Sequence, residues 1–248
     1  MVKLAPYHDF QPLALEPTTR VFVLTGAGIS AESGIRTFRD ANGLWEQYRV
    51  EDVASPEGWA ANPALVWRFY SARRAQAKTV IPNPAHLALA RLEDMLGERL
   101  FLCTQNVDPL HERAGSRRAV HMHGELMKSR CEQDHAPPFD DHATYLDGEP
   151  LPRCSCGGRI RPHICWFGEI PFEMDRIVEA LRACDLFVTI GSSGAVYPAA
   201  GFAETARRAG AKTVYVGTEE PDNARGFDEC RLGKAGDAVP LLFRAAVG

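Results

Sequence analysis

The feature that most constrains this chain is an apolar run that ends directly in a glycine turn. Residues 21–24 read VFVL, and TGAG follows at residues 25–28. Such a run is typical of a central parallel strand that is buried on both faces. Glycine lets the backbone approach a ligand closely, and Ser30 or Ala31 is placed to open a helix whose free N–H groups face a pyrophosphate. The stretch predicts a dinucleotide site, and the same G-x-G-x-x-A pattern also fits a simple tight turn between strand and helix.

The residues after this turn depart from the pattern of a hydride-transferring enzyme. A dehydrogenase continues its first helix into a second strand that ends in an acidic residue about 20 positions on, whereas Ser33-Gly34 ends the predicted helix early. The loop that follows is rich in charged and aromatic side chains: Arg36, Phe38, Arg39, Asp40 and Trp45. A long loop of this kind beside a phosphate site predicts a lid over a cofactor.

Length and composition narrow the class of protein. The chain has 248 residues, of which 45% are hydrophobic, enough for one large domain or a domain with an insertion. The net charge of −4 argues against binding a phosphate backbone, so nucleic acid is not an expected partner. No run is long and apolar enough to span a membrane, and the first 16 residues lack a signal-peptide core. Seven cysteines, an odd number, suit reduced thiols in the cytoplasm.

Further apolar runs alternate with helical patterns along the chain. Proline follows a capping residue at Ser55, Asn62 and Asn83, which predicts three helix starts. Strands are expected at residues 100–103, 164–167, 186–190 and 213–216, and residues 1–19 are expected to form a surface arm with little order. The alternation predicts an α/β fold with a Rossmann-like, doubly wound parallel sheet.

Polar residues follow several of these strands directly. Gln105, Asn106 and Asp108 come after the strand at 100–103, and GSSG at residues 191–194 follows the strand at 186–190. In an open α/β sheet the ligand lies beyond the carboxyl ends of the strands, so these loops are expected to share a pocket with the first glycine loop. A capped turn without a ligand is the alternative interpretation of Gln105, Asn106 and Asp108.

Two histidines, His121 and His123, end another strand-like segment. Both point to the same face if the segment is extended, so geometry alone does not separate them. The order of motifs along the chain resembles the sirtuins, the NAD-consuming protein deacylases: GAGIS at 26–30, TQNVD at 104–108, HG at 123–124, WFGE at 166–169 and GSSG at 191–194. Only His123 has the histidine–glycine pairing of that family, so His121 is assigned a structural role.

The resemblance implies a reaction and a set of residues that perform it. In the family, the carbonyl oxygen of an acyl-lysine attacks the ribose carbon of NAD as nicotinamide leaves, and the products are free lysine, nicotinamide and O-acyl-ADP-ribose. His123 is then the general base on a ribose hydroxyl, with Asn106 and Asp108 beside the nicotinamide ribose and carboxamide and Gln105 on the ribose. The implied NAD contacts are Gly26, Ala27, Gly28, Glu32, Thr37, Phe38, Arg39, Trp45, Gln105, Asn106, Val107, Asp108, Gly191, Ser192, Ser193, Gly217, Thr218, Glu219 and Ala235.

Gly217 is a departure from the family pattern. Many relatives carry asparagine there, directed at the adenosine ribose, so only backbone groups at Gly217 and Ala235 are expected to contact the adenosine end. Two other activities fit the same NAD site: a mono-ADP-ribosyltransferase, and a non-catalytic NAD or ADP-ribose sensor.

The resemblance also implies a pocket for acylated lysine side chains of proteins. Tyr70 and Arg73 form the Y-x-x-R pair of relatives that accept succinyl and malonyl groups alongside acetyl, because arginine can contact a carboxylate. A surface arginine beside a core tyrosine is the alternative. The small side chain of Ala41 leaves room for a longer acyl group. Phe167, Gly168 and Val196 are expected along the acyl-lysine tunnel and the bound peptide.

The segment 128–161 is where the resemblance weakens. Sirtuins hold a structural zinc ion with two C-x-x-C pairs, whereas this chain offers Cys131, Cys154 and Cys156. The fourth ligand is open among Asp134, His135 and His142, and metal-free packing is the alternative. The predicted division is an NAD-binding lobe (1–53, 83–127 and 162–248) and a small lobe made of a helical insertion (54–82) and a zinc-module-like insertion (128–161).

Overall fold

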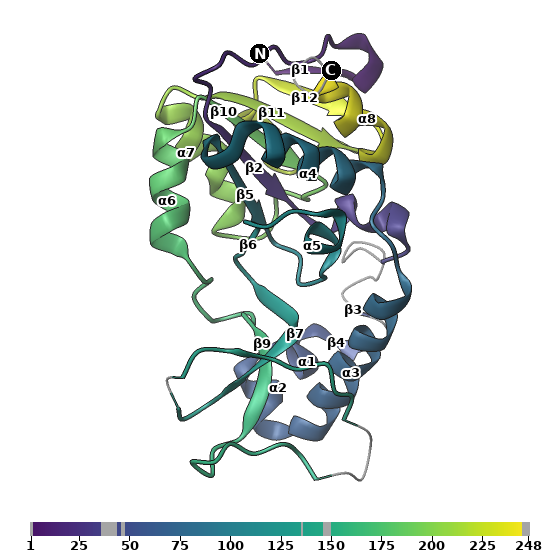
Figure 1. Ribbon diagram of the computed structural model, residues 1–248, viewed down its shortest axis with the longest axis vertical. Helices are drawn as coiled ribbons and strands as arrows, with labels where there is room; N and C mark the ends of the chain where they lie inside the picture. Colours follow the sequence, from purple (N-terminus) through teal and green to yellow (C-terminus); the bar gives the residue numbers. More distant parts are fainter. Residues whose placement is uncertain (1, 36–43, 46–47, 135, 146–149, 245–248) are drawn as a thin grey trace.

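A computed structural model describes residues 2–35, 44–45, 48–134, 136–145 and 150–244. Figure 1 shows two parts: a large lobe built on a twisted sheet, and a small lobe that holds β7 and β9 with the first three helices. No helix within the described residues has the length and apolar character needed to cross a bilayer.

The large lobe is a parallel sheet of seven strands among the described residues, in the order β1-β12-β11-β10-β2-β5-β6. Its strands are β1 Lys3–Pro6, β2 Val21–Thr25, β5 Leu100–Thr104, β6 Val120–His121, β10 Leu186–Ile190, β11 Lys212–Gly217 and β12 Glu229–Leu232. The chain proceeds from β2 outward to β5 and β6, then returns to β10 on the other side of β2. The carboxyl ends of β2 and β10 therefore form the switch point at which such sheets bind ligands.

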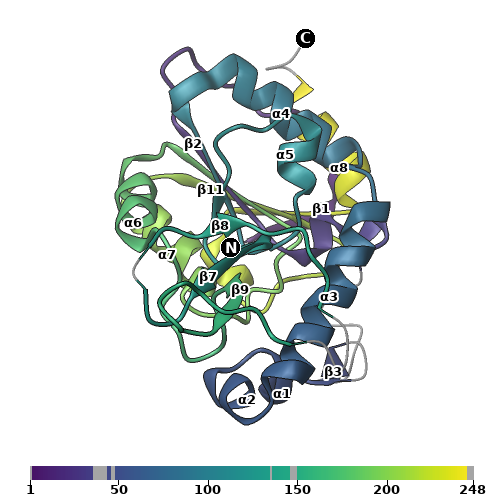
Figure 2. The same ribbon diagram turned by 60° about the horizontal axis from the view of Figure 1, so that its bottom comes forward.

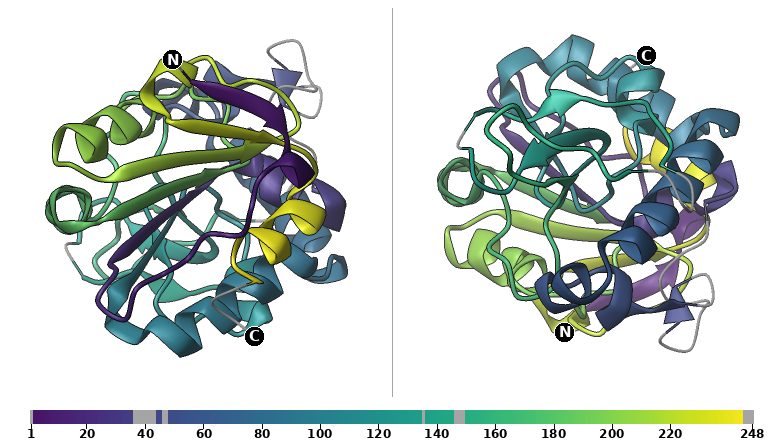
Figure 3. Two further views of the ribbon diagram at one scale, coloured as in Figure 1. Left: turned by 90° about the horizontal axis from the view of Figure 1, so that it is seen from above. Right: turned by 90° about the horizontal axis from the view of Figure 1, so that it is seen from below.

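Helices cover both faces of this sheet, which Figure 3 shows from above and below. One face packs against α4 Pro84–Leu96 and α8 Ala235–Leu242, and the other packs against α6 Met174–Ala183 and α7 Phe202–Arg208. A short α5, Leu110–Ala114, links β5 to β6, and single 3-10 turns lie at Tyr7–Asp9, Gly97–Arg99, Ala199–Gly201 and Ala224–Gly226. Because both faces are covered, every residue of β2 and β10 is buried.

The small lobe combines helices with a thin antiparallel sheet, and it comes forward in Figure 2. Its helices are α1 Val50–Val53, α2 Pro56–Ala61 and α3 Pro63–Thr79. Its strands are β7 Gly124–Cys131, β8 Phe139–Asp140 and β9 Ile160–Ile164, with a separate pair, β3 Leu44–Trp45 and β4 Tyr48–Arg49. An aromatic cluster fills the space between helices and sheet: Trp59, Trp67, Phe69, Tyr70 and Trp166.

The structure confirms the Rossmann-like sheet and the three predicted helix starts. The side chains of Ser55, Asn62 and Asn83 accept hydrogen bonds from Gly58, Leu65 and Ala85 at the starts of α2, α3 and α4. Each cap satisfies one backbone N–H that the first helical turn leaves without a partner.

Two expectations about strands were wrong. The first 19 residues are not a loose arm, because β1 pairs in parallel with β12 and both Phe10 and Leu13 are buried. Residues 164–167 do not rejoin the large sheet: Ile164 pairs with Gly124 in the small sheet, and the three residues after it are not in a strand. A short apolar run predicts a buried strand, but it does not identify its partner. The division into lobes at residues 53, 82, 127 and 161 stays a prediction.

Candidate active site between the glycine loops and His123

Three loops leave the sheet side by side, at the carboxyl ends of the adjacent strands β10, β2 and β5. The loop after β2 forms two 3-10 turns, Ala27–Ile29 and Ala31–Ser33, and ends at Gly34 with φ of 92°. The helix expected to open at Ser30 or Ala31 is present as a single 3-10 turn, and it ends early at Ser33-Gly34 as predicted, because the left-handed glycine stops it after three residues.

Glycine is required where the first and last loops touch. A Cβ at Gly28 would lie 2.7 Å from the Cα of Gly191, and a Cβ at Gly26 would lie 2.8 Å from the Gly191 oxygen. The Gly28 N–H donates to the Gly191 carbonyl at 2.8 Å, and Gly191 has φ of 64°. The two glycine loops thus pack backbone against backbone, which only residues without a side chain permit.

The loop after β5 is hydrogen-bonded to both glycine loops. Asn106 Nδ2 donates to the carbonyl of Gly26 and to Ser30 Oγ, both at 3.1 Å. Gln105 Nε2 donates to Ser192 Oγ at 3.0 Å. The predicted convergence of Gln105 and Asn106 on the glycine loops is present, and Val107 joins the lobes through its carbonyl, which accepts from Leu126 N at 2.8 Å.

Asp108 is buried in the same network. Ser30 Oγ donates to its Oδ2 at 3.1 Å and Leu110 N donates to its Oδ1 at 3.1 Å. Burial raises the pKa of the Asp108 carboxyl, and these two hydrogen bonds counter only part of that effect. Ser30 therefore connects Asn106 and Asp108, a role that the sequence analysis missed. The sequence did hold a clue to this role, because Ser30 is the only residue with a hydroxyl side chain in the GAGIS motif.

His123 lies in the turn that leads from the large lobe into β7, and its ring is held in one tautomer. Its Nδ1 is 3.0 Å from the carbonyl of Gln105. A carbonyl only accepts, so Nδ1 carries the proton and Nε2 of the neutral ring keeps its lone pair. Burial lowers the pKa of His123 below its ordinary value, and the Gln105 carbonyl opposes this shift in part. The imidazole is thus a neutral base near pH 7.

His121 has the opposite chemistry, although it is only two residues away. Its Nδ1 is 2.9 Å from the carbonyl of Asn106 and its Nε2 is 2.9 Å from Glu112 Oε1. Both partners accept, so both nitrogens donate. Burial lowers the pKa of His121, but the hydrogen bond and negative charge of Glu112 outweigh it and raise the pKa overall. Neither nitrogen of His121 is available to accept a proton, so the two rings differ in chemistry, and the structural role of His121 stays a prediction.

A second polar network lies beneath the loops. Thr25 Oγ1 donates to Thr104 Oγ1 at 2.8 Å and lies 2.9 Å from His111 Nε2. Thr25 and Thr104 are the last residues of β2 and β5, so this network fixes the points from which two of the loops start. Burial lowers the pKa of His111 well below its ordinary value, which keeps the ring neutral.

Two of the implied NAD contacts, Glu32 and Ala235, lie beside each other at the start of α8. Glu32 accepts a hydrogen bond of 2.7 Å from the N–H of Gly236, beside Ala235 at the first turn of α8. Gly217 ends β11, and a Cβ there would overlap the Tyr215 hydroxyl, which explains the glycine. The next two residues, Thr218 and Glu219, are exposed, and Ser193 lies in the neighbouring loop after β10.

The predicted acyl pocket lies on α3 in the small lobe. Tyr70 is fully buried and accepts a hydrogen bond of 3.0 Å from Trp166 Nε1, while Arg73 is 6% exposed. Residues three apart share one face of a helix. Phe167 is 49% exposed, Gly168 adopts φ of 92°, and the Val196 carbonyl accepts from Ala200 N at 2.8 Å.

Five predicted site residues cannot be placed in the site. Thr37, Phe38, Arg39 and Ala41 lie outside the described residues, and so does the side chain of Trp45, whose backbone belongs to β3.

Three cysteine thiols meet in the small lobe, beside the end of β7. The Sγ atoms of Cys131, Cys154 and Cys156 all lie within 4.8 Å of one another. Two backbone N–H groups donate to Cys131 Sγ at 3.3 and 3.4 Å, and Gly158 N donates to Cys156 Sγ at 3.4 Å. Converging sulfur ligands that accept backbone hydrogen bonds suit zinc, which these residues would hold as a structural ion.

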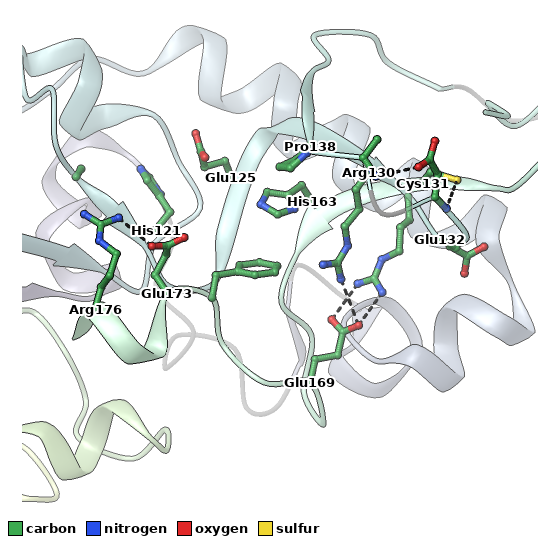
Figure 4. A pocket seen from close by; sticks show the side chains of 15 residues that line it. His121, Glu125, Arg130, Cys131, Glu132, Pro138, His163, Glu169, Glu173 and Arg176 are labelled. Atoms are coloured by element: carbon green, nitrogen blue, oxygen red, sulfur yellow. Dashed lines mark hydrogen bonds and ion pairs between the residues drawn. The ribbon is translucent and has the colours of Figure 1, made fainter. Parts of the chain in front are cut away.

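A cavity of about 780 Å³ lies between the two lobes and is shown in Figure 4. His121, Arg130, His163 and Glu169 line it, whereas His123 and the glycine loops do not. Arg161 donates to Glu169 at 2.7 and 3.0 Å, and Arg130 reaches the same carboxylate at 3.4 Å. This cavity is therefore separate from the candidate active site.

The family of this chain follows from its match to a protein-family model. The model of the Sir2 family matches residues 26–198, which include both glycine loops and His123. The chain belongs to the Sir2 family. It is 54% identical over 230 residues to an NAD-dependent protein deacylase of Shewanella oneidensis, covering 90% of this chain and 92% of that protein. It is 52% identical over 231 residues to one of Escherichia coli K12, covering 92% and 82%.

Solved structures of Sir2 proteins share the fold. A Sir2 homologue variant in complex with ADP ribose aligns with a TM-score of 0.84 at 37% identity, covering 92% of each chain. A Sir2 homologue in complex with NAD aligns with a TM-score of 0.84 at 35% identity, covering 96% of each. A Sir2 protein bound to an acetylated peptide aligns with a TM-score of 0.78 at 26% identity, covering 92% of this chain and 94% of that one.

Proposed function

We propose that this Sir2 protein removes acyl groups from protein lysines and consumes NAD in doing so. The observation that carries the proposal is the ring of His123, whose Nδ1 is hydrogen-bonded to Gln105, while Gln105 is itself bonded to the second glycine loop. The neutral imidazole, which has its lone pair at Nε2, is thus connected through Gln105 to the loops that we propose hold NAD.

In the proposed reaction, each group of this chain has a defined task. The acyl oxygen bonds to the ribose carbon as nicotinamide departs with the electrons of the broken bond. His123 Nε2 then takes the proton of a ribose hydroxyl as that oxygen attacks the acyl carbon, and water completes the release of lysine and O-acyl-ADP-ribose. Asn106 and Asp108 hold the nicotinamide end, and Ser30 keeps both side chains in place.

We further propose that acidic acyl groups, succinyl and malonyl, are accepted alongside acetyl. Tyr70 already accepts from Trp166, so the proton of its hydroxyl is directed elsewhere. The hydroxyl and the guanidinium of Arg73 lie on one side of α3, close enough for the charge of Arg73 to lower the pKa of Tyr70 against the larger effect of burial. A donor and a cation together match a carboxylate. The seven free thiols suit a reducing cytoplasm as the place of action.

Product masses test the reaction. The protein is incubated with NAD and with succinyl-, malonyl- and acetyl-lysine forms of one peptide, and the products are weighed. Free lysine peptide with O-acyl-ADP-ribose is expected. A protein that gains the mass of ADP-ribose is instead a transferase, and NAD binding without turnover indicates a sensor.

The Arg73→Met variant tests the acyl pocket. We expect desuccinylation to fall at least about tenfold more than deacetylation, since a hydrogen-bonded ion pair to the substrate is lost. Arg68→Met makes the same change on the exposed side of α3 and should affect both activities equally little. Equal losses in Arg73→Met would contradict the carboxylate role.

A further inference from the structure

The three-thiol cluster of Cys131, Cys154 and Cys156 has an acidic side chain beside it. Asp134 Oδ2 lies 3.9 Å from Cys154 Sγ, and its Oδ1 accepts from Ala136 N at 2.9 Å. We propose that Asp134 is the fourth ligand of a zinc ion in this cluster, so that the site is three thiolates and one carboxylate.

The spacing of the atoms agrees with the edges of a zinc tetrahedron. With Zn–S near 2.3 Å and Zn–O near 2.1 Å, two sulfurs are about 3.8 Å apart, and a sulfur and an oxygen are about 3.6 Å apart. The Sγ atoms of Cys131 and Cys156 are 3.5 Å apart, and the Asp134–Cys154 distance is 3.9 Å. Asp134 Oδ2 is not within 4.8 Å of all three thiols, so the proposal requires its side chain to rotate toward Cys131 and Cys156 when zinc binds.

The backbone around the cluster is already arranged for thiolates. The N–H groups of Gln133 and Asp134 both donate to Cys131 Sγ. A Cβ at Gly158 would lie 2.8 Å from that sulfur, so glycine is needed for the loop to close around it. Asp134 thus contributes to the cluster twice, with its main chain to one sulfur and with its carboxylate next to another.

Neighbouring side chains are committed to other contacts. Glu132 accepts from Trp59 Nε1 at 2.6 Å and from Arg159 Nε at 2.6 Å. Neither His142 nor Asp134 lies within 4.8 Å of all three thiols, but Asp134 Oδ2 contacts Cys154 Sγ at 3.9 Å, a contact that His142 lacks among the described residues. Asp134 has no cation as a partner within the described ranges, and His135 lies outside them.

Replacing a thiolate by a carboxylate keeps the charge of the site but changes its affinity. Oxygen is a harder donor than sulfur, so zinc is held less tightly than by four thiolates. Cys131 and Asp134 also line the cavity between the lobes, and Figure 4 shows Cys131 at one end of it. Solvent and chelators therefore reach the ion from that cavity.

Metal binding by the full-length chain tests the proposal directly, with no need for an activity assay. Zinc per chain is measured by mass spectrometry after dialysis, zinc affinity by competition with a chromophoric chelator, and the donor set by the absorption spectrum of the cobalt-substituted protein. We expect about one zinc per chain, and at least about tenfold weaker binding in Asp134→Ala.

Three variants complete the design. Asp134→Cys should bind zinc more tightly than the parent and strengthen the sulfur-to-cobalt absorption, which also shows that the site tolerates substitution. His135→Ala tests the competing ligand, and Asp140→Ala makes the matched change at an exposed acid on β8; both should bind zinc as the parent does. Parent-like affinity and cobalt spectrum in Asp134→Ala, or a parent chain that retains no zinc, would overturn the proposal.

Discussion

The active-site crevice and the interior of the small lobe use polar side chains in opposite ways. In the crevice, hydrogen bonds join short side chains and backbone groups, such as Asn106 to Gly26 and Ser30 to Asp108. In the small lobe, two buried arginines, Arg74 and Arg161, each join several segments. Arg74, with no exposed side chain, donates to the carbonyls of Leu126 and Ala143 at 2.8 and 2.9 Å.

The charges of these arginines are balanced within the lobe. Arg74 lies 3.1 Å from Asp141, and Arg161 forms a two-bond pair with Glu169 while its guanidinium lies 3.3 Å above the Trp166 ring. The small sheet has three strands among the described residues, and β7 has only the two-residue β8 and the five-residue β9 as neighbours. A sheet so thin leaves many backbone carbonyls without strand partners, and long donors such as arginine satisfy them.

Comparing the two regions shows which polar side chains can act on a ligand. Seven parallel strands satisfy the backbone of the large lobe, so the polar residues at their ends can be directed at a ligand. Apart from the proposed acyl pocket, the buried arginines of the small lobe, Arg74 and Arg161, hold its loops together. Substitutions in the crevice should therefore change activity, and substitutions of these two arginines should change stability.

The largest expected effect is on catalysis by His123. His123→Ala should lower kcat/KM by about 10²–10⁴-fold, because a positioned base is lost, and leave the unfolding temperature nearly unchanged. His8→Ala, at an exposed histidine, is the matched control. A loss of kcat/KM of less than tenfold, or a strongly lowered unfolding temperature, would contradict the expected separation of activity from stability.

Arg74→Met should destabilise the protein by about 3–5 kcal/mol, because Asp141 then remains buried without its cation. Urea unfolding measures the change. Arg117→Met removes an arginine from an exposed pair with Asp94 and should cost less than about 1 kcal/mol. Adding Asp141→Asn to Arg74→Met should recover part of the loss; an unchanged midpoint in Arg74→Met would show that the small lobe does not depend on this pair.

Ser30→Ala tests whether a substitution in the crevice can change activity without also changing stability. Asn106 Nδ2 and Asp108 Oδ2 each lose a partner, and leaving a buried polar group unpaired costs about 1–3 kcal/mol. We expect weaker NAD binding by calorimetry and a modest fall in unfolding temperature together. Unchanged NAD affinity would indicate that Ser30 does not position these side chains.

The smallest expected effect is a difference in acid sensitivity. Burial raises the pKa values of Asp141 and Glu169, but hydrogen bonds and the arginine charges outweigh it and lower both. A carboxyl with a lowered pKa in the folded state stabilises it above the unfolded pKa near 4, and this stability is lost as the pH falls through the folded pKa. Urea unfolding should therefore show a falling midpoint below about pH 4.

Catalysis should be affected by acid through a different group. The acid limb of kcat/KM should have its midpoint below 6.5, since burial lowers the pKa of His123 and only the neutral ring accepts a proton. A midpoint above 6.5 would instead indicate a residue such as His121, whose pKa is raised.

The sequence predicted the crevice much better than the small lobe. Gln105, Asn106 and Ser192 directly follow apolar strands, so strand ends and residue order were enough to bring them together. The pairing of β1 with β12 and the choice between His121 and His123 depend on partners far along the chain. The contacts of Arg74 likewise span 52 to 69 residues, and no local pattern encodes them.

The hydrogen bond between Trp166 and Tyr70 joins segments 96 residues apart, one in the helical insertion and one after the small sheet. In the proposed acyl pocket, the preference for an acyl chain is therefore a property that both segments share. A chimaera that imports residues 54–82 from a relative with another preference would replace Tyr70 and keep Trp166, whereas one that also imports residues 160–169 would replace both partners of the hydrogen bond together. Engineering new specificity in this enzyme means exchanging the two segments together.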